Sequence, residues 1–360
     1  MDFGLSELQL SIQENLNRFL DEQAPLDRVR EFATTDHALA QDIWKGLVEL
    51  GVVGTLIPED YGGSGLSAMD AAVIGECLGS HVTPVPYLST CVVAPRAITM
   101  GGSDTQKQAY LAAIAEGNTV FGIALSEACA ARSNAGSTCN DGKLTGSANF
   151  VSDPDANFWL VADRQSKLHV VASDAPGIEK KIMPHVDRTR PLCALTFTNT
   201  PCETLERSGA DVLAHVLDVA WTVLAFDTLG AAQSMLDQAV EYAKQREQFN
   251  RVIASFQAVK HMCAEMAAEL EPARALLWYA GFALDDAPGD AHLHACHAKA
   301  HLAEVGTFVA RTATVVHGGM GFTDLLGLHY WFKRIGFNRQ FLGGPEWLRE
   351  QAAIAQNLAA

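Results

Sequence analysis

The hydrophobic pattern of the chain changes its period twice, and this order of periods limits the possible folds more than any other feature. Residues 1–117 carry apolar side chains at helical spacing, residues 118–207 carry short β-type runs, and residues 208–360 return to helical spacing. Helices and strands repeat their apolar positions at different periods, so each change marks a predicted domain boundary. The sequence therefore predicts a mostly α protein in which a central β domain separates an N-terminal helical domain from a C-terminal helical bundle.

Signals inside each segment support this division. Ser6 with Gln9 predicts a capping box at the first helix, and residues 58–65 (PEDYGGSG) predict a turn-rich loop. After Asp211 two apolar stripes predict long helices that pack together, and the acidic stretch 285–290 (DDAPGD) predicts the turn between two of them. Strands are expected at residues 120–125, 158–162, 168–172 and 192–198.

Composition excludes several classes of function. The 360 residues are 48% hydrophobic, enough for a substantial core, and 42 acidic against 26 basic residues give a net charge of −16. Nucleic acid and anionic membranes are therefore not expected as partners. The chain does not begin with a basic segment followed by an apolar one, and no apolar run reaches the roughly 18 residues of a membrane span, so we expect a cytoplasmic protein.

Cysteine and histidine spacing predicts no metal site. The eight cysteines lack the CxxC spacing typical of zinc or redox sites, which predicts buried free thiols. Four histidines gather in one stretch without an accompanying carboxylate pattern, so we expect solvated or interface histidines rather than metal ligands. These four are His292, His294, His297 and His301.

Three local motifs add to the order of segments. They are residues 56–65 (LIPEDYGGSG), residues 242–250 (YAKQREQFN) followed by 255–260 (SFQAVK), and residues 316–323 (VHGGMGFT). In this order and spacing the chain resembles the acyl-CoA dehydrogenase family along nearly its whole length. The family carries a Pro-Glu-x-Tyr-Gly-Gly-x-Gly loop, an Arg-x-Gln-Phe-Gly segment with a following Phe-Gln, and a Gly-Gly-x-Gly turn.

The resemblance implies a fold, a cofactor and a reaction. The fold is an N-terminal helical domain, a middle β-barrel or sandwich and a C-terminal four-helix bundle. Members bind FAD and remove the α and β hydrogens of an acyl-CoA thioester, a glutamate taking the α proton while the flavin accepts the β hydride. Electron-transfer flavoprotein is the expected electron acceptor.

The resemblance also assigns cofactor contacts in the bundle. Arg246 and Gln248 are expected to reach across a subunit interface to the ADP half of a neighbour's FAD, where a guanidinium can hold a diphosphate bidentately. Phe249, Phe256 and Gln257 keep the family spacing. The alternative for Arg246 is an arginine that complements the dipole at the C-terminal end of its helix.

The glycine turn is the second expected nucleotide contact. Gly318 and Gly319 would let the backbone approach the nucleotide closely, and an ordinary turn between helices is the alternative. Asn250 replaces the glycine that usually follows the phenylalanine, but asparagine also tolerates a left-handed conformation. Val315 stands where the family commonly has a glutamine, which weakens or removes one contact.

In the β domain Ser126 and Ser152 occupy the two pieces that resemble the lining of the isoalloxazine ring, residues 125–127 (LSE) and 150–152 (FVS). Ordinary strand-end residues are the alternative. The next stretch, residues 127–133 (EACAARS), lacks both family glycines and puts Arg132 where a small serine is expected. We therefore expect this chain to hold an isoalloxazine ring poorly by itself.

Both places at which the family carries its catalytic glutamate are occupied by residues that cannot take a proton. Leu342 stands at the first, near the C-terminus, and Ala220 at the second, in the helix before Arg246. Asp227 is a weak candidate base, because it shares a helix face with Ala220 but lies roughly 10 Å farther along the axis. Asp218 and Glu346 are weaker still and are more simply interpreted as solvated surface charges.

Loss of both glutamates beside the retained arginine resembles the shorter subunit of heteromeric acyl-CoA dehydrogenases of steroid side-chain breakdown. We therefore expect a subunit of a heterotetramer that helps to bind FAD seated on a second, glutamate-bearing subunit. Two alternatives stay open. One is a self-sufficient homo-oligomeric dehydrogenase that uses Asp227 or another carboxylate, and the other is a non-enzymatic assembly or regulatory pseudoenzyme.

Overall fold

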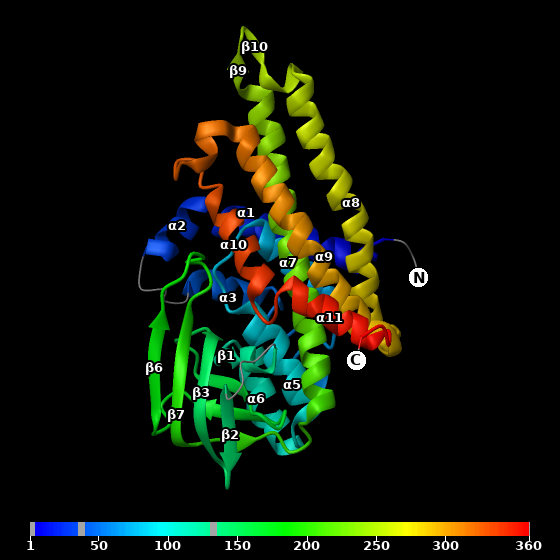
Figure 1. Cartoon of the computed structure of the whole chain (residues 1–360). Helices are drawn as coiled ribbons and strands as arrows, with labels where there is room; N and C mark the ends of the chain where they lie inside the picture. The colour runs from blue at the N-terminus through cyan, green and yellow to red at the C-terminus, as the bar shows by residue number, and fades with distance from the viewer. Residues whose placement is uncertain (1–3, 35–39, 130–134, 360) are drawn as a thin grey trace.

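The computed structural model describes residues 4–34, 40–129 and 135–359, in regions that follow the order of the sequence (Figure 1). Ser6 caps the first helix as predicted, because its hydroxyl accepts the Gln9 N–H (3.2 Å) and the Gln9 side chain accepts the Ser6 N–H (3.0 Å). The N-terminal elements are α1 (Glu7–Gln23), α2 (Leu26–Thr34), α3 (Gln41–Glu49), η1 (Glu59–Tyr61), α4 (Ala68–Ser80), the π-helix η2 (Tyr87–Val93), α5 (Ala94–Gly101) and α6 (Asp104–Ala115).

Two four-stranded sheets and the short 3-10 helix η3 (Ser126–Ala128) make up the described part of the middle region. One sheet has the order β1-β4-β5-β8 and the other the order β2-β3-β7-β6. β1 runs parallel to β4, and the other neighbouring strands are antiparallel. The strands are β1 (Phe121–Ala124), β2 (Gly136–Asn140), β3 (Lys143–Ser152), β4 (Phe158–Ala162), β5 (Leu168–Ala172), β6 (Ile178–Met183), β7 (Leu192–Pro201) and β8 (Glu203–Thr204).

The C-terminal region is a helical bundle built around one long helix, α7 (Ala210–Gln245). By length and hydropathy α7 would qualify as a membrane span, but 83% of its most apolar window is buried inside this protein, which identifies a core helix. The remaining elements are β9 (Glu247–Gln248), β10 (Arg251–Val252), η4 (Ile253–Ser255), α8 (Gln257–Asp286), α9 (Pro288–His317), η5 (Gly318–Phe322), α10 (His329–Gln340) and α11 (Pro345–Ala355).

Glycines let α4 and α7 cross in close contact. A Cβ on Gly79 would lie 2.1 Å from the carbonyl oxygen of Asp227, and one on Gly230 would lie 1.9 Å from that of Glu76. Real side chains do not tolerate such distances, so glycine is required on both sides of the crossing. The crossing fixes the middle of α7, the helix that carries Ala220 and Asp227 and ends beside Arg246.

The predicted order of helical, β and helical regions is confirmed. Each of the four expected strands is present, as β1, β4, β5 and β7, and α8 gives way to α9 within the acidic stretch 285–290. The pattern did not predict β2, β3, β6 or β8. β6 (IEKKIM), for example, is mostly exposed and carries no apolar run.

Candidate functional site

The segment after α7 projects from one end of the bundle as a short hairpin (Figure 1). α7 ends at Gln245, and Arg246 is its C-cap in an extended conformation. β9 and β10 pair with Gln248 opposite Arg251. Residues 246–250 are exposed, and within the described parts of the chain the Arg246 side chain forms no hydrogen bond or ion pair. Its guanidinium is therefore available to a group outside this chain.

Both residues at the tip of the hairpin have a left-handed backbone. Their φ angles are +54° at Phe249 and +60° at Asn250, the combination of a type I′ turn. Asparagine tolerates this conformation, as predicted, whereas a bulky residue pays roughly 1–2 kcal/mol. Phe249 is also 85% exposed. Neither the strain nor the exposure stabilises this chain, so both favour a role for Phe249 in contact with another molecule.

The glycine turn lies at the same end of the bundle as the hairpin. The last turns of α7 and α9 meet through Tyr242 and His317, whose ring centroids are 4.7 Å apart. Gly318 follows with φ +57° and ψ −138°, a conformation that favours glycine. A Cβ built on Gly318 or Gly319 would meet no atom within 4 Å, so open space lies in front of the turn.

Exposed apolar side chains surround this open space. Val315 is 62% exposed one turn before the glycines, Phe322 is 79% exposed at the end of η5, and Leu325 is 75% exposed just beyond it. Together with Phe249 they form what we term the distal surface. A free guanidinium, an accessible glycine backbone and apolar side chains fit the nucleotide end of FAD and an adjoining protein surface.

The β-domain residues assigned to the flavin ring lie at the other end of the molecule. Ser126 begins η3 directly after β1, and Ser152 ends β3. The Ser152 hydroxyl accepts the Ile123 N–H (3.1 Å) and bonds to the Asp153 carboxyl. A hydroxyl has one proton to donate, and Asp153 takes it, so Ser152 has none for a flavin ring. Arg132 lies outside the described residues.

A cavity of about 630 Å³ borders Ser152 at the end of β3 and Phe341 near Leu342. Its lining includes Ser152 and Asp153, Ser89 of η2, and Phe341, which directly precedes Leu342. The volume is that of a typical small-molecule site. It lies among the N-terminal helices, the β domain and α10, whereas the distal surface lies at the far end of α7.

Asp153 is a candidate residue that the sequence interpretation missed. It has a left-handed backbone, with φ +55°, and its carboxyl accepts a hydrogen bond from Ser89 (2.5 Å). Burial raises the pKa of Asp153, against hydrogen bonds from Ser89 and Ser152 that lower it. A strained carboxyl with a raised pKa at a cavity is typical of a proton-transfer site. Its only sequence signal was its place immediately after the motif that ends at Ser152.

Leu342 and Ala220, the two residues that the resemblance assigns to the glutamate positions, both lie in the interior. Leu342 is 2% exposed and Ala220 is fully buried. Trp221, directly after Ala220, donates its Nε1–H to the carbonyl oxygen of Leu342 (2.7 Å). The sequence comparison of these two positions is therefore consistent with the geometry, in which neither offers a carboxylate or an open space for a thioester.

A buried lysine lies next to Leu342 in the same part of the interior. Lys299 of α9 is 2% exposed, and its ammonium donates to the carbonyl oxygen of Gly343. Burial lowers the pKa of Lys299 to about 7, partly offset by the nearby Cys129 and Cys296. Periodicity and local motifs did not indicate this lysine, because it stands alone on an otherwise apolar helix face.

Asp227 lies in a buried ion-pair network rather than at a cavity. Its carboxylate accepts hydrogen bonds from Arg190 (2.6 Å), Arg334 (3.0 Å) and Asn338 (2.6 Å). Arg334 is fully buried and also contacts Asp187 at 3.3 Å. These partners come from the loop before β7 and from α10, so the network joins the β domain to the bundle. Compensation by two guanidinium groups favours a structural role for Asp227.

The interpretation of Asp218 as a surface charge was wrong. Asp218 is 5% exposed and accepts a hydrogen bond from His292 Nδ1 (2.8 Å). This bond raises the pKa of His292 to about 10, so the two form an ion pair at neutral pH. Glu346 does lie at the surface, with a side chain that is 74% exposed.

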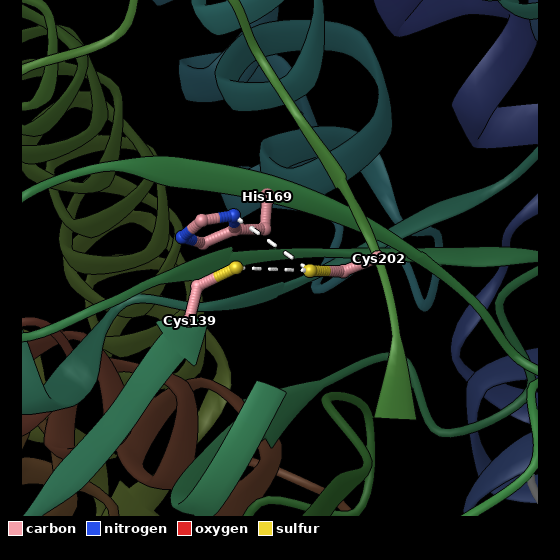
Figure 2. A group of neighbouring side chains, drawn as sticks. All are labelled: Cys139, His169 and Cys202. Atoms are coloured by element: carbon pink, nitrogen blue, oxygen red, sulfur yellow. Dashed lines mark hydrogen bonds between the residues drawn. The ribbon is translucent and has the colours of Figure 1, made fainter. Parts of the chain in front are cut away.

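Among the other histidines of α9, His294 and His297 lie side by side, with ring centroids 6.2 Å apart. His294 packs edge-on against Tyr279, with ring centroids 4.4 Å apart, and His301 is exposed. A different group does come together: Cys139, Cys202 and His169 lie close to one another in the β domain (Figure 2). The CxxC argument could not detect them, because their separations in the sequence exceed any local motif.

The cysteines differ in part from the predicted buried free thiols. All eight are free, and five of them are buried. Cys139, Cys202 and Cys263 are partly exposed, so the prediction was wrong about the burial of these three.

Comparisons with known proteins agree with the fold. The family models for the N-terminal and C-terminal domains of acyl-CoA dehydrogenases match residues 6–118 and 207–357. The acyl-CoA dehydrogenase FadE34 of Mycobacterium tuberculosis is 32% identical over 326 residues, which cover 88% of this chain and 43% of FadE34. The chain thus spans less than half the length of that relative.

Two further comparisons cover nearly complete chains. The acyl-CoA dehydrogenase FadE27 of Mycobacterium tuberculosis is 26% identical over 358 residues, which cover 96% of this chain and 95% of FadE27. A solved structure of the Tcur3481-Tcur3483 steroid ACAD superposes with a TM-score of 0.90 at 29% identity and covers 98% of both chains. This chain belongs to the acyl-CoA dehydrogenase family.

Proposed function

We propose that this chain is the subunit without a catalytic base in a heteromeric, FAD-dependent acyl-CoA dehydrogenase. It contributes Arg246 and Gln248 to the ADP end of an FAD that is held mainly by a second, glutamate-bearing subunit. The observation that carries the proposal is the contrast between the filled interior at Leu342 and Ala220 and the unpaired, exposed Arg246. The relative described as a steroid ACAD supports a heteromer and a bulky, steroid-derived acyl-CoA.

The residues of this chain have binding and orienting roles in this proposal. Bound FAD supplies the hydride acceptor for α,β-dehydrogenation. The Arg246 guanidinium, which has no partner among the described residues, neutralises a diphosphate with two parallel N–H bonds. Gln248 adds amide donors and acceptors beside it, and the Gly318–Gly319 backbone leaves room for the nucleotide. Phe249, Phe256 and Gln257 support or extend this edge.

Assembly and location belong to the same proposal. The distal surface docks against the glutamate-bearing subunit to give a heterotetramer, since its apolar side chains are otherwise left in water. The complex acts in the cytoplasm and passes its electrons to electron-transfer flavoprotein.

Co-expression with a glutamate-bearing homologue tests the proposal. We expect a complex whose native mass exceeds that of either chain, with flavin absorbance and acyl-CoA dehydrogenation that neither chain shows alone. The proposal fails if this chain alone binds stoichiometric FAD and dehydrogenates an acyl-CoA.

Arg246→Ala in the complex separates a cofactor role from a purely structural one. We expect FAD affinity to fall about 10-fold to 100-fold, because a charge-assisted bond contributes about 1.5–3 kcal/mol. Lys244→Ala is the matched control, since Lys244 is an exposed cation on the last turn of α7 that pairs with Glu241. Unchanged FAD content in the Arg246 variant would instead support the assembly pseudoenzyme.

One observation favours a self-sufficient enzyme as the second candidate. Asp153 places a carboxyl with a raised pKa at the cavity, whereas Asp227 has all its partners inside the protein. For this candidate, Asp153→Asn would abolish dehydrogenation by the lone chain. Asp174→Asn serves as the control, because Asp174 is an exposed aspartate that does not line the cavity.

A further inference from the structure

Three side chains from different strands of the β domain face one another at the boundary between its two sheets. Cys139 lies on β2, His169 lies on β5 of the other sheet, and Cys202 lies in the link between β7 and β8. Figure 2 shows the two sulfur atoms and the imidazole ring facing one another, with dashed lines from the Cys202 sulfur to Cys139 and to His169. None of these residues belongs to the cavity or to the distal surface.

The distances match those among ligands of a single zinc ion. The two sulfur atoms are 3.5 Å apart, and Cys202 Sγ lies 3.9 Å from His169 Nδ1. With bonds of about 2.3 Å to sulfur and about 2.0 Å to nitrogen, a tetrahedral ion separates two sulfurs by about 3.7 Å and sulfur from nitrogen by about 3.5 Å. All three ligand atoms lie within 4.8 Å of one another, so only a small side-chain adjustment is required.

Hydrogen bonds around Asp163 fix His169 in the tautomer that carries its proton on Nε2, which is the tautomer needed for a metal at Nδ1. His169 Nε2 bonds to Asp163 Oδ2 at 3.1 Å, and the other oxygen of Asp163 accepts the N–H groups of Gln165 (2.8 Å) and Lys167 (2.9 Å). A carboxylate held by two backbone donors keeps its second oxygen directed at Nε2–H. The lone pair therefore resides on Nδ1, which lies 3.9 Å from Cys202 Sγ and 2.9 Å from the Thr204 hydroxyl. The Thr204 hydroxyl must turn away from Nδ1 when this nitrogen binds a metal.

We propose that Cys139, Cys202 and His169 bind a zinc ion with Asp163 as the supporting carboxylate. Binding releases the two thiol protons to solvent, and two thiolates with a neutral imidazole balance the charge of a divalent cation. Water occupies the fourth position, which solvent reaches because both cysteines are partly exposed. The ion joins the two sheets of the β domain, so its binding stabilises the folded chain.

Metal content and cobalt spectroscopy test the proposal on the full-length chain. We expect about one zinc per chain after purification in reducing buffer without chelator, measured by mass spectrometry of the metals. After chelation, Co²⁺ should produce thiolate-to-cobalt charge-transfer absorption and the intense visible bands of a tetrahedral site. Zinc should displace that spectrum and raise the melting temperature of the chelated protein by several degrees.

Substitutions locate the site. Cys139→Ser and Cys202→Ser should each remove the zinc and the cobalt spectrum, whereas Cys263→Ser, a partly exposed cysteine on α8, should leave both unchanged. Asp163→Asn should weaken zinc binding about 10-fold to 100-fold, because it removes only the support of His169.

Two results on the unsubstituted chain would overturn the proposal. One is the absence of zinc together with the absence of a thiolate–cobalt spectrum in reduced protein. The other is a Cys139–Cys202 disulfide that persists in reducing buffer, identified by peptide mass. Neither result depends on a variant that folds, and neither bears on FAD binding.

Discussion

The two ends of α7 have opposite characters. Near Ala220 the helix is buried, and Trp221 of the same helix donates to the carbonyl oxygen of Leu342 while Lys299 donates to that of Gly343. Past Gln245 the chain becomes an exposed, strained hairpin with an unpaired arginine and an 85% exposed phenylalanine. A protein that carried out the chemistry itself would keep space and a carboxylate at the first end. The difference teaches that the unpaired arginine and the exposed phenylalanine of this chain lie at a surface, where only a second molecule can contact them.

The largest expected effect concerns the buried middle of α7, where Asp227 lies. Asp227→Asn keeps the shape of the side chain but removes the carboxylate that pairs with Arg190 and leaves Arg334 with Asp187 alone, so the free energy of unfolding should fall by about 3–5 kcal/mol. Denaturant titration measures the change. Asp237→Asn, an exposed position on the same helix, should change it by less than about 0.5 kcal/mol. A lone chain that loses activity at Asp227→Asn without losing stability would reverse this assignment.

Lys299→Met tests how much the buried ammonium of Lys299 destabilises the folded chain. The folded-state pKa of about 7 lies below that of an unfolded lysine, so the unfolded chain binds more protons between about pH 7 and 10.5 and wild-type stability rises with pH across that window. The variant removes this cost but loses the bond to Gly343. We expect it to be about 2–4 kcal/mol more stable at pH 7.

The pH dependence of that gain is the sharper measurement. Chemical denaturation from pH 6.5 to 9.5 should show the advantage of Lys299→Met shrinking steadily as pH rises. A constant advantage over this range would mean that Lys299 titrates normally and that packing alone explains the gain.

Phe249→Gly tests the role of the exposed hairpin that follows α7. Glycine adopts φ +54° without strain, so the isolated chain should gain about 0.5–1 kcal/mol of stability. The same change removes an exposed aromatic anchor, so assembly with the glutamate-bearing subunit should weaken by roughly tenfold or more. Thermal denaturation of the lone chain and titration of the partner measure the two effects. Loss of stability in the lone chain would show that Phe249 serves its own fold.

The smallest expected effect concerns the pair of His292 and Asp218. Because the folded pKa of His292 is raised to about 10, its stabilisation is fully present below about pH 6.5 and is lost as pH rises through about 10. His292→Gln should therefore cost up to about 1 kcal/mol at pH 6, a modest value since the histidine side chain is 40% exposed, and almost nothing above pH 10. His301→Gln, exposed on the same helix, should show no such trend.

Some of these features were readable from the sequence. The order of regions, four strands, the end of α7 at Arg246 and the occupants of the two glutamate positions all followed from periodicity or local motifs, because these depend on neighbours within a few residues. The surface interpretation of Asp218 failed because an isolated aspartate on an apolar helix gives no sign of a histidine 74 residues away. Asp153 and Lys299 were missed for the same reason.

The sequence by itself determined that this chain has the segments of an acyl-CoA dehydrogenase, and its resemblance to that family predicted that Leu342 and Ala220 stand at the glutamate positions. Only the tertiary structure decided that those positions are filled, that Asp227 is compensated by two arginines, and that two cysteines and a histidine meet between two sheets. The physical reason is the range of the interactions. Helix periods, caps and turns are local, whereas burial, ion pairing and metal geometry depend on atoms brought together from distant parts of the chain.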